Sequence, residues 1–170
     1  ATHFALEPSH ALDNPTLARV RRLADELEIP VALPVHESTW EVAESLARHG
    51  ARPLDRLVRL GFASPLLVAV HGTCLSPADI DALAACGAAV VHCPESNLKL
   101  GSGVCPAADL LGRGVRVALG TDGAASNNDL DVLSEMRTAG LLAAGVSARP
   151  GALVARDLLR CGPLDRLLED

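Results

Sequence analysis

Short apolar runs alternate with amphipathic helical stretches along the whole chain. Runs of strand length that carry aliphatic or β-branched residues and lack the helical period predict strands. These runs cover residues 4–6, 29–35, 66–70, 88–91 and 115–119. Apolar positions at helical spacing predict helices. These stretches cover residues 16–27, 41–48, 53–60, 77–86, 107–112 and 130–144, with a final amphipathic stretch at about 152–168.

The alternation of strand and helix indicates a parallel sheet. Strand and helix alternate about five times, which is typical of repeated βαβ units. No Gly-rich dinucleotide fingerprint follows the first strand, and the glycines at 101–103 and 120–123 are not spaced for one. We therefore expect an α/β fold that is an incomplete (β/α) TIM-type barrel.

Composition and charge narrow the function classes. Hydrophobic residues make up 49% of the 170 residues and aromatic residues only 2%, so the core must consist of Ala, Leu and Val, as in helices packed on buried parallel strands. The net charge of −6 argues against nucleic-acid binding, which needs a basic face. We see no membrane span or signal peptide. The five cysteines form no CxxC pair, which favours small buried side chains in a reducing cytoplasm.

Titratable residues close or follow every predicted strand. They are Glu7 or His10, His36 and Glu37, His71, His92, and Asp122. In a (β/α) barrel the chemistry collects at the carboxyl ends of the strands. A set of histidines with one Asp and one Glu is what a divalent metal and a general acid/base require.

Three longer strings carry a family resemblance. They are Val70-His71-Gly72-Thr73, the run 91–100 that contains SNLKL, and the run 119–128 that contains GTDGAASNN. These strings resemble consecutive motifs of the amidohydrolase-superfamily deaminases, above all the methylthioadenosine/S-adenosylhomocysteine deaminases, also called TRZ/ATZ hydrolases. The likeness covers roughly residues 4 to 145. It implies that residues 1–145 are the C-terminal part of the barrel, roughly its last five strand-helix units without a β-sandwich domain. Residues 146–170 are then a divergent helical tail.

The resemblance also implies an activity and roles. Such enzymes are metal-dependent hydrolases, and the implied reaction is deamination of an adenosine-type purine nucleoside by metal-activated water, with zinc as the expected metal. Asp122 would be a metal ligand that also accepts a proton from the water. Glu37 would move a proton to the substrate, and His71 would polarise and contact it. Ser126 could reach the substrate, whereas His92 is expected to be structural and residues 96 and 97 to shape a loop.

This chain departs from the family pattern at three places. Pro34 stands where the family has a metal-ligating His, and His36, two residues further on the same strand face, is the candidate replacement ligand. The substrate-contacting His of the family's Pro-His-Ala-Pro-Tyr motif aligns with Glu7 without a gap, or with His10 if the loop is three residues shorter, which we favour. The His-x-His pair of the first barrel strand is missing from the sequence.

Three hypotheses follow from these departures. The chain is part of a truncated or split deaminase, a degenerate homologue that binds a ligand without turnover, or an unrelated α/β binding module. We expect the isolated chain to be inactive. Half a barrel leaves two sheet edges and an apolar inner face uncovered, so we also expect self-association or a partner that supplies the N-terminal half-barrel.

Overall fold

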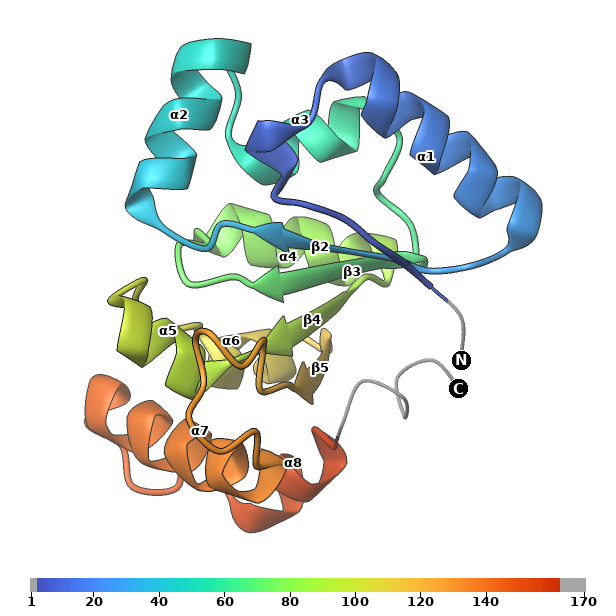
Figure 1. Cartoon of the computed structure of the whole chain (residues 1–170). Coiled ribbons are helices and arrows are strands. Elements are labelled where there is room, and N and C mark those ends of the chain that lie inside the picture. The colour runs from blue at the N-terminus through green and yellow to red at the C-terminus, as the bar shows by residue number, and fades with distance from the viewer. Residues whose placement is uncertain (1–2, 163–170) are drawn as a thin grey trace.

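A computed structural model describes residues 3–162 as one parallel sheet flanked by helices (Figure 1). The five strands are β1 (Phe4–Ala5), β2 (Val31–Val35), β3 (Leu67–His71), β4 (Ala89–His92) and β5 (Arg116–Leu119). They pair in the order β1-β2-β3-β4-β5, which is also their order in the chain. A doubly wound sheet would reverse direction at a switch point, so the sequential order confirms the predicted barrel segment. The described residues contain no β-sandwich.

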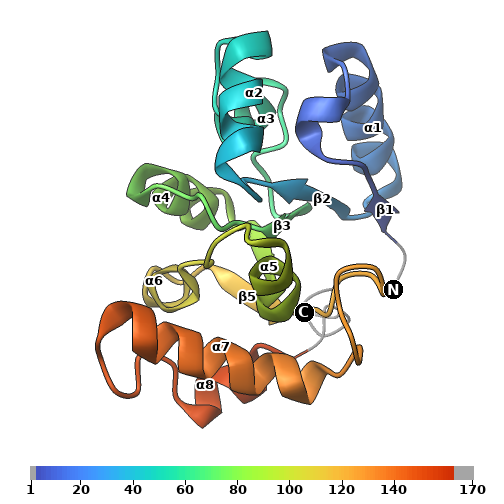
Figure 2. The ribbon, with the colours of Figure 1, turned by 60° about the vertical axis from the view of Figure 1, so that its left-hand side comes forward.

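Helices connect successive strands and follow one another around one side of the sheet (Figure 2). They are η1 (Ser9–Ala11), α1 (Asn14–Leu27), α2 (Thr39–His49), α3 (Pro53–Arg59), α4 (Pro77–Cys86), α5 (Pro94–Leu100), α6 (Ala107–Gly112), α7 (Val132–Ser147) and α8 (Ala155–Arg160). α7 runs across the domain boundary predicted after residue 145. The predicted final helix is represented by α8, and residues 163–168 of that prediction lie outside the described residues.

Residues 96 and 97, which were expected to shape a loop, lie in the helix α5. Pro94 occupies the first helical position, where its missing N–H costs nothing. Gly101 ends the helix with φ +69°, a left-handed cap that glycine adopts without a Cβ clash. Helical periodicity did not predict α5 because the helix is seven residues long.

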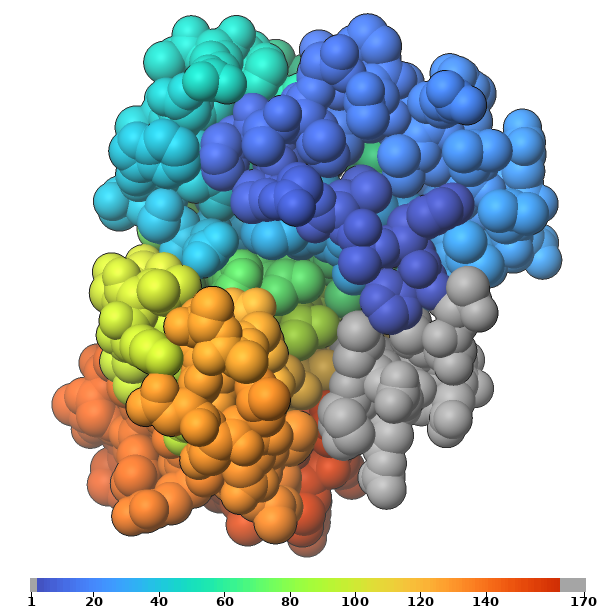
Figure 3. Space-filling view, in the orientation of Figure 1, coloured from blue at the N-terminus to red at the C-terminus, as the bar shows by residue number. Residues whose placement is uncertain are grey.

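The two faces of the sheet differ in side-chain size. Toward the helices the strands present large aliphatic residues, among them Leu33, Leu67 and Leu119. The opposite face corresponds to the barrel interior and carries mostly Ala and Val, namely Ala32, Val68, Ala89, Val91 and Ala118. All five are buried, and the segment that connects β5 to α7 lies in front of the last strands (Figure 3). The prediction of an uncovered inner face is therefore wrong for these positions.

The outer edge of β5 is partly covered as well. The N–H of Leu119 donates to the carbonyl of Cys161 at 2.8 Å, so the chain after α8 lies against this edge. β1 is the other outermost strand and has only two residues. Such short or covered edges reduce the tendency to pair with another sheet.

Pro34 fits inside β2 because of the direction in which its missing N–H would point. The N–H of Val31 donates toward β3, and N–H directions alternate along a strand, so position 34 faces the β1 side. β1 has ended there, since its last strand residue, Ala5, pairs with Ala32. No ladder hydrogen bond is lost, which is the usual condition for proline in a strand.

Candidate active site at the carboxyl edge of the sheet

Three of the predicted site residues share an unusual backbone conformation. His36, His71 and Asp122 follow or close their strands with φ values of +56°, +75° and +60°. Residues other than glycine adopt this left-handed conformation at a cost of about 1–2 kcal/mol. Such residues cluster at functional sites, where the surrounding structure enforces them. The conformation also ends the two-residue alternation of the strand, so each side chain can point where the strand pattern does not predict.

The His71 ring is held in one orientation and faces Glu37. Its Nδ1 lies 2.9 Å from Oδ1 of Asn97 on α5, an arrangement in which Nδ1–H donates to the amide oxygen and Nε2 is left for another partner. Nε2 is 3.8 Å from Oε2 of Glu37. The main chain of Glu37 is fixed, because its N–H donates to Glu41 Oε2 at 2.6 Å and its carbonyl accepts from Thr73 Oγ1 at 2.6 Å. The structure therefore brings the predicted proton carrier beside a buried imidazole.

Asp122 is oriented by two hydroxyl groups. Its Oδ2 accepts hydrogen bonds from Ser96 Oγ at 2.7 Å and from Ser126 Oγ at 2.8 Å. Partial burial alone would raise the pKa of Asp122, but these hydroxyls, the Gly123 N–H and the nearby His71 outweigh it and hold the pKa below its usual value. Asp122 is therefore ionised at neutral pH. Ser126, predicted to contact substrate, is used here to orient Asp122.

The helix α5 joins the two halves of the site. Ser96 binds Asp122 and its neighbour Asn97 binds His71. The sequence prediction gave these two residues only a part in shaping a loop. The SNLKL string marked them, but the pairing depends on a helix that the pattern did not predict.

Glu135 on α7 holds α5 and the segment after Asp122 together. Its buried carboxylate accepts from the N–H of Glu95 at 3.0 Å and from Nδ2 of Asn127 at 2.6 Å. Burial raises the pKa of Glu135 above its usual value. No feature of the sequence identified Glu135 as part of the site, because its place in a helix is an ordinary one for Glu.

His92 lies at the end of β4 and is buried. Its Nδ1 has no hydrogen-bond partner among the described residues. Burial, together with the nearby His71, lowers the pKa of His92 to about 4. The ring is therefore neutral at pH 7, and its structural role stays a prediction.

His36 points away from the other site residues. Its Nε2 accepts from the N–H of Leu54 at 3.3 Å and lies 3.8 Å from Asp79, while Nδ1 lies 3.4 Å from Arg52. These partners belong to α3, α4 and the residue before α3, on the helix side of the sheet. The expectation that His36 faces the same side as Pro34 is wrong, because β2 ends at Val35 and the left-handed backbone turns the ring. The structure does not support His36 as a metal ligand.

The loop after β1 places His10 rather than Glu7 against another element. Glu7 is exposed. The His10 ring meets the Trp40 ring of α2 edge to face, with centroids 5.2 Å apart and an interplanar angle of 89°. Arg56 of α3 holds this loop by donating to the carbonyls of Ser9 and Leu12.

The described residues do not make a metal site by themselves. No group of three or more His, Cys, Asp or Glu within residues 3–162 could hold a metal ion. Asp122 is one carboxylate, Pro34 has no donor atom, and the His36 nitrogens have protein partners. A catalytic zinc needs about three protein ligands. The described residues could contribute Asp122 to such a site but could not complete it.

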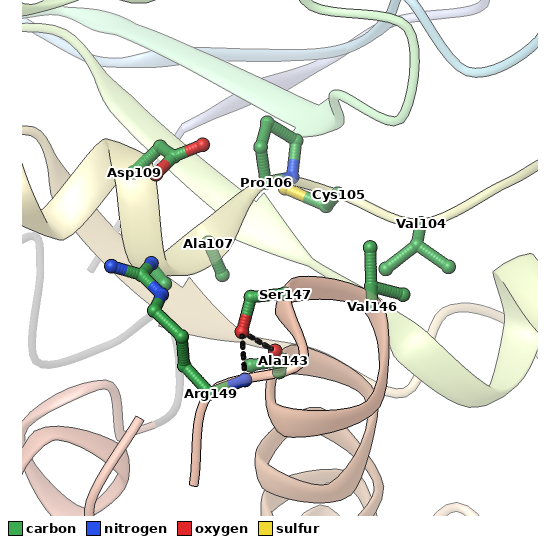
Figure 4. Close-up of a pocket in the computed structure, with 10 residues that line it drawn as sticks. Val104, Cys105, Pro106, Ala107, Asp109, Ala143, Val146, Ser147 and Arg149 are labelled. Atoms are coloured by element: carbon green, nitrogen blue, oxygen red, sulfur yellow. Dashed lines mark hydrogen bonds between the residues drawn. The ribbon is translucent and has the colours of Figure 1, made fainter. Parts of the chain in front are cut away.

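A cavity elsewhere in the molecule lies apart from these groups (Figure 4). It has a volume of about 140 Å³ and is lined by residues of 104–109 and 143–149. The Ser147 hydroxyl beside it donates to the Ala143 carbonyl and accepts from the Arg149 N–H. The thiol of Cys105 is buried, which raises its pKa and keeps it protonated. None of the site residues described above lines this cavity.

Comparison with known proteins identifies the family. The model of the Amidohydrolase family matches residues 2–161. This chain belongs to the amidohydrolase family. The match continues beyond residue 145, so the boundary of the divergent tail stays a prediction.

Relatives within the family carry more specific names. The chain is 45% identical over 150 residues to a 5-methylthioadenosine/S-adenosylhomocysteine deaminase of Saccharophagus degradans, covering 88% of this chain and 34% of that one. A deaminase of the same name from Pyrococcus furiosus is 43% identical over 141 residues, covering 83% and 34%. These matches confirm the predicted resemblance. The chain spans about a third of the length of these relatives.

Solved structures agree with the fold. An adenosine deaminase of Xanthomonas campestris with bound zinc superposes with a TM-score of 0.92 and 51% identity, over 95% of this chain and 37% of that one. The zinc complex of the atrazine chlorohydrolase TrzN of Arthrobacter aurescens gives a TM-score of 0.80 and 25% identity, over 88% and 35%. Among the described residues, no helix is long and apolar enough to cross a membrane.

Proposed function

We propose that this chain supplies the proton-transfer part of a hydrolase that deaminates adenosine-type purine nucleosides, with methylthioadenosine and S-adenosylhomocysteine as the substrates in view. The observation that carries the proposal is that Glu37, His71 and the ionised Asp122 meet at one edge of the sheet through α5. The names and the identity of the relatives support the reaction class.

The residues divide the proton transfers. In the hydrolysis, a water oxygen bonds to the ring carbon that bears the amino group, and the bond from that carbon to nitrogen breaks to release ammonia. Asp122 is ionised and would accept a proton from the water. Glu37 would carry a proton to the ring nitrogen and then to the leaving amine. His71 would hold the substrate in place with the Nε2 that Asn97 leaves free.

The metal requires residues from outside the described part of the chain. The zinc named for two similar structures makes zinc the proposed cofactor. Because no group of three or more His, Cys, Asp or Glu within residues 3–162 could hold a metal ion, the ligands that complete the site would come from a complementary half-barrel. We therefore propose that the isolated chain is inactive and works with such a half. We also propose a cytoplasmic location.

The test combines this chain with a matched partner. The part of the Xanthomonas campestris enzyme that precedes the matching segment is a suitable complement, because the matched segments superpose with a TM-score of 0.92. We expect no change in adenosine-type absorbance from the chain with zinc salt alone, and turnover once the complement is added. The Asp122→Asn chain in the same mixture is the control and should be inactive. Turnover by the isolated chain would show that the site is complete without a partner.

A second candidate function is binding without turnover. The observation that favours it is Pro34, which replaces a family ligand by a side chain without a donor atom. Calorimetry of the assembled protein with S-adenosylhomocysteine separates the two functions. Heat of binding without ammonia release would favour the degenerate homologue.

A further inference from the structure

Two kinds of hydrogen bond link the end of β2 to the segment after β3. The carbonyl of His36 accepts from the main-chain N–H of Cys74 at 2.9 Å. The carbonyl of the next residue, Glu37, accepts instead from a side chain, the Oγ1 of Thr73, at 2.6 Å. The bond at Glu37 therefore depends on which residue occupies position 73, whereas the main chain supplies the bond at His36.

The Thr73 hydroxyl lies where three segments of the carboxyl edge meet. Besides the Glu37 carbonyl, the carbonyls of His36 and Ser102 lie 3.2 and 3.1 Å from Oγ1. A hydroxyl group has one proton to donate, and the bond to Glu37 is the shortest of the three. Thr73 follows β3, Glu37 follows β2 and Ser102 follows α5, so one side chain contacts all three segments.

The segment after α5 packs closely on Thr73. Gly103 has φ +124°, and a Cβ at this position would lie 3.3 Å from both Cβ and Oγ1 of Thr73. A glycine permits this backbone conformation and this close approach. The N–H of the preceding Ser102 donates to the carbonyl of Asn97 at 2.9 Å. The segment on Thr73 is therefore fixed to the residue that orients the His71 ring.

These contacts relate the two groups that face each other in the site. Glu37 Oε2 lies 3.8 Å from Nε2 of His71. Thr73 holds the main chain of Glu37, Asn97 holds the ring of His71, and the segment after Asn97 packs on Thr73. The separation of the carboxylate and the ring thus depends on Thr73. A displacement of about 1 Å at an acting group can cost about 10²-fold in rate.

We propose, on the basis of the proposed function, that Thr73 is a positioning residue that holds Glu37 at the distance from His71 that proton transfer requires. Its hydroxyl contacts main-chain carbonyls and the neighbouring Cys74 thiol, so it acts through Glu37 and not on the substrate. Loss of the hydroxyl should therefore lower kcat and leave KM almost unchanged.

The first test compares two substitutions of Thr73. Thr73→Val keeps the shape of the side chain but places a methyl group where Oγ1 lies 2.6 Å from the Glu37 carbonyl. A carbon atom needs about 3.3 Å or more from a carbonyl oxygen, so the main chain of Glu37 must move away. In the assembled protein we expect kcat for methylthioadenosine to fall about tenfold or more, with KM within about twofold. Thr73→Ser keeps the hydroxyl and should keep most of kcat.

The second test does not depend on turnover. Amide hydrogen exchange of residues 36–41 is followed by mass spectrometry in the 170-residue chain, alone and with the complement described above. Thr73→Val should speed this exchange roughly threefold to tenfold, because the Glu37 main chain loses a hydrogen bond, and Thr73→Ser should not.

Ser147→Ala is the matched control for both tests. The Ser147 hydroxyl also donates to a main-chain carbonyl at 2.6 Å, that of Ala143, but it lies beside the cavity apart from the site. Its loss should leave kcat and the exchange of residues 36–41 unchanged. Far-ultraviolet circular dichroism checks that each variant folds. If Thr73→Val does not fold, Thr73→Ala removes the hydroxyl without adding a methyl group near the carbonyls, and the same changes are expected.

The outcomes separate this inference from the proposed function. An equal loss of kcat in Thr73→Val and Thr73→Ser would overturn the inference, as would a rise in KM at unchanged kcat. Unchanged exchange of residues 36–41 in Thr73→Val would also overturn it, whether or not the assembled protein turns over its substrate. Faster exchange in Thr73→Val together with no turnover by the original assembled protein would support the positioning of Glu37 and overturn the deaminase.

Discussion

His36 and His71 lie at the ends of neighbouring strands and share a backbone conformation, but their rings point in different directions and have different partners. Both are buried and both have a left-handed φ. The ring of His36 turns toward the helices, where Leu54, Arg52 and Asp79 surround both nitrogens. The ring of His71 turns toward the carboxyl edge, where only Nδ1 has a close partner and Nε2 faces Glu37.

The comparison shows that the partners of a strand-end histidine determine its use. A ring whose two nitrogens are satisfied by the protein is a structural element, and burial lowers the pKa of His36 to about 4, so it stays neutral. A ring that has one nitrogen without a close protein partner, facing a carboxylate, can act on a substrate. Removing His36 should therefore affect mainly stability, and removing His71 mainly activity.

The largest expected effect is the loss of activity in His71→Asn. The variant removes the ring nitrogen Nε2 that faces Glu37. In the assembled protein, kcat/KM for methylthioadenosine should fall about 10³-fold, within the range for positioned acid/base groups. The midpoint of urea unfolding of the chain should change little. A variant that is as active as the original chain would remove His71 from the site.

The next effect is on the free energy of unfolding in His36→Leu. The substitution leaves the Leu54 N–H without its acceptor and Asp79 without a neighbouring ring, so we expect a loss of about 2–3 kcal/mol by urea unfolding. His36→Gln keeps an acceptor and should lose less. Equal losses in the two variants would show that the hydrogen bond to Leu54 is not the cause.

The same histidine predicts a pH dependence. The folded pKa of about 4 lies below the unfolded value of 6.5, so the unfolded chain binds more protons between these values. The contribution of His36 to stability is present above about pH 6.5 and is lost as the pH falls through 4. His36→Gln should lose less stability than the original chain between pH 7 and 5.

Glu41, whose carboxyl group accepts from the Glu37 N–H, predicts the opposite pH dependence of stability. Burial raises the pKa of Glu41 to about 7 from 4.5, so the folded chain binds more protons than the unfolded one in this window. Stability should fall as the pH rises from 4.5 through 7. Glu41→Gln still accepts from the Glu37 N–H and should stabilise the chain by about 2 kcal/mol at pH 8 and hardly at pH 4.5. An equal gain at both pH values would contradict this origin.

The sequence was sufficient to predict the fold and the titratable residues at the strand ends. The five strands and most helices follow from apolar runs and helical spacing, and the titratable residues after them could be read directly. The direction of the His36 ring could not be predicted from the sequence. The two-residue alternation of side chains holds only for extended backbone, and the backbone of His36 is left-handed. The same limit applies to α5, whose seven residues carry too little periodicity, and to the burial of Glu135.

The smallest expected effect concerns the metal ligand of the family that Pro34 replaces and that neither His36 nor His71 supplies. Position 34 lies on the inner face of the sheet beside Val70, its pairing partner in β3, whereas His36 lies on the other face. Pro34→His places an imidazole on that inner face without breaking a ladder hydrogen bond, because the new N–H faces the side where β1 has ended. In the assembled protein we expect zinc affinity to rise about tenfold or more, measured by competition with a chelator. The increase should persist when His36→Gln is added. If it disappears with His36, then that residue does reach the metal and the contrast between the two histidines is wrong.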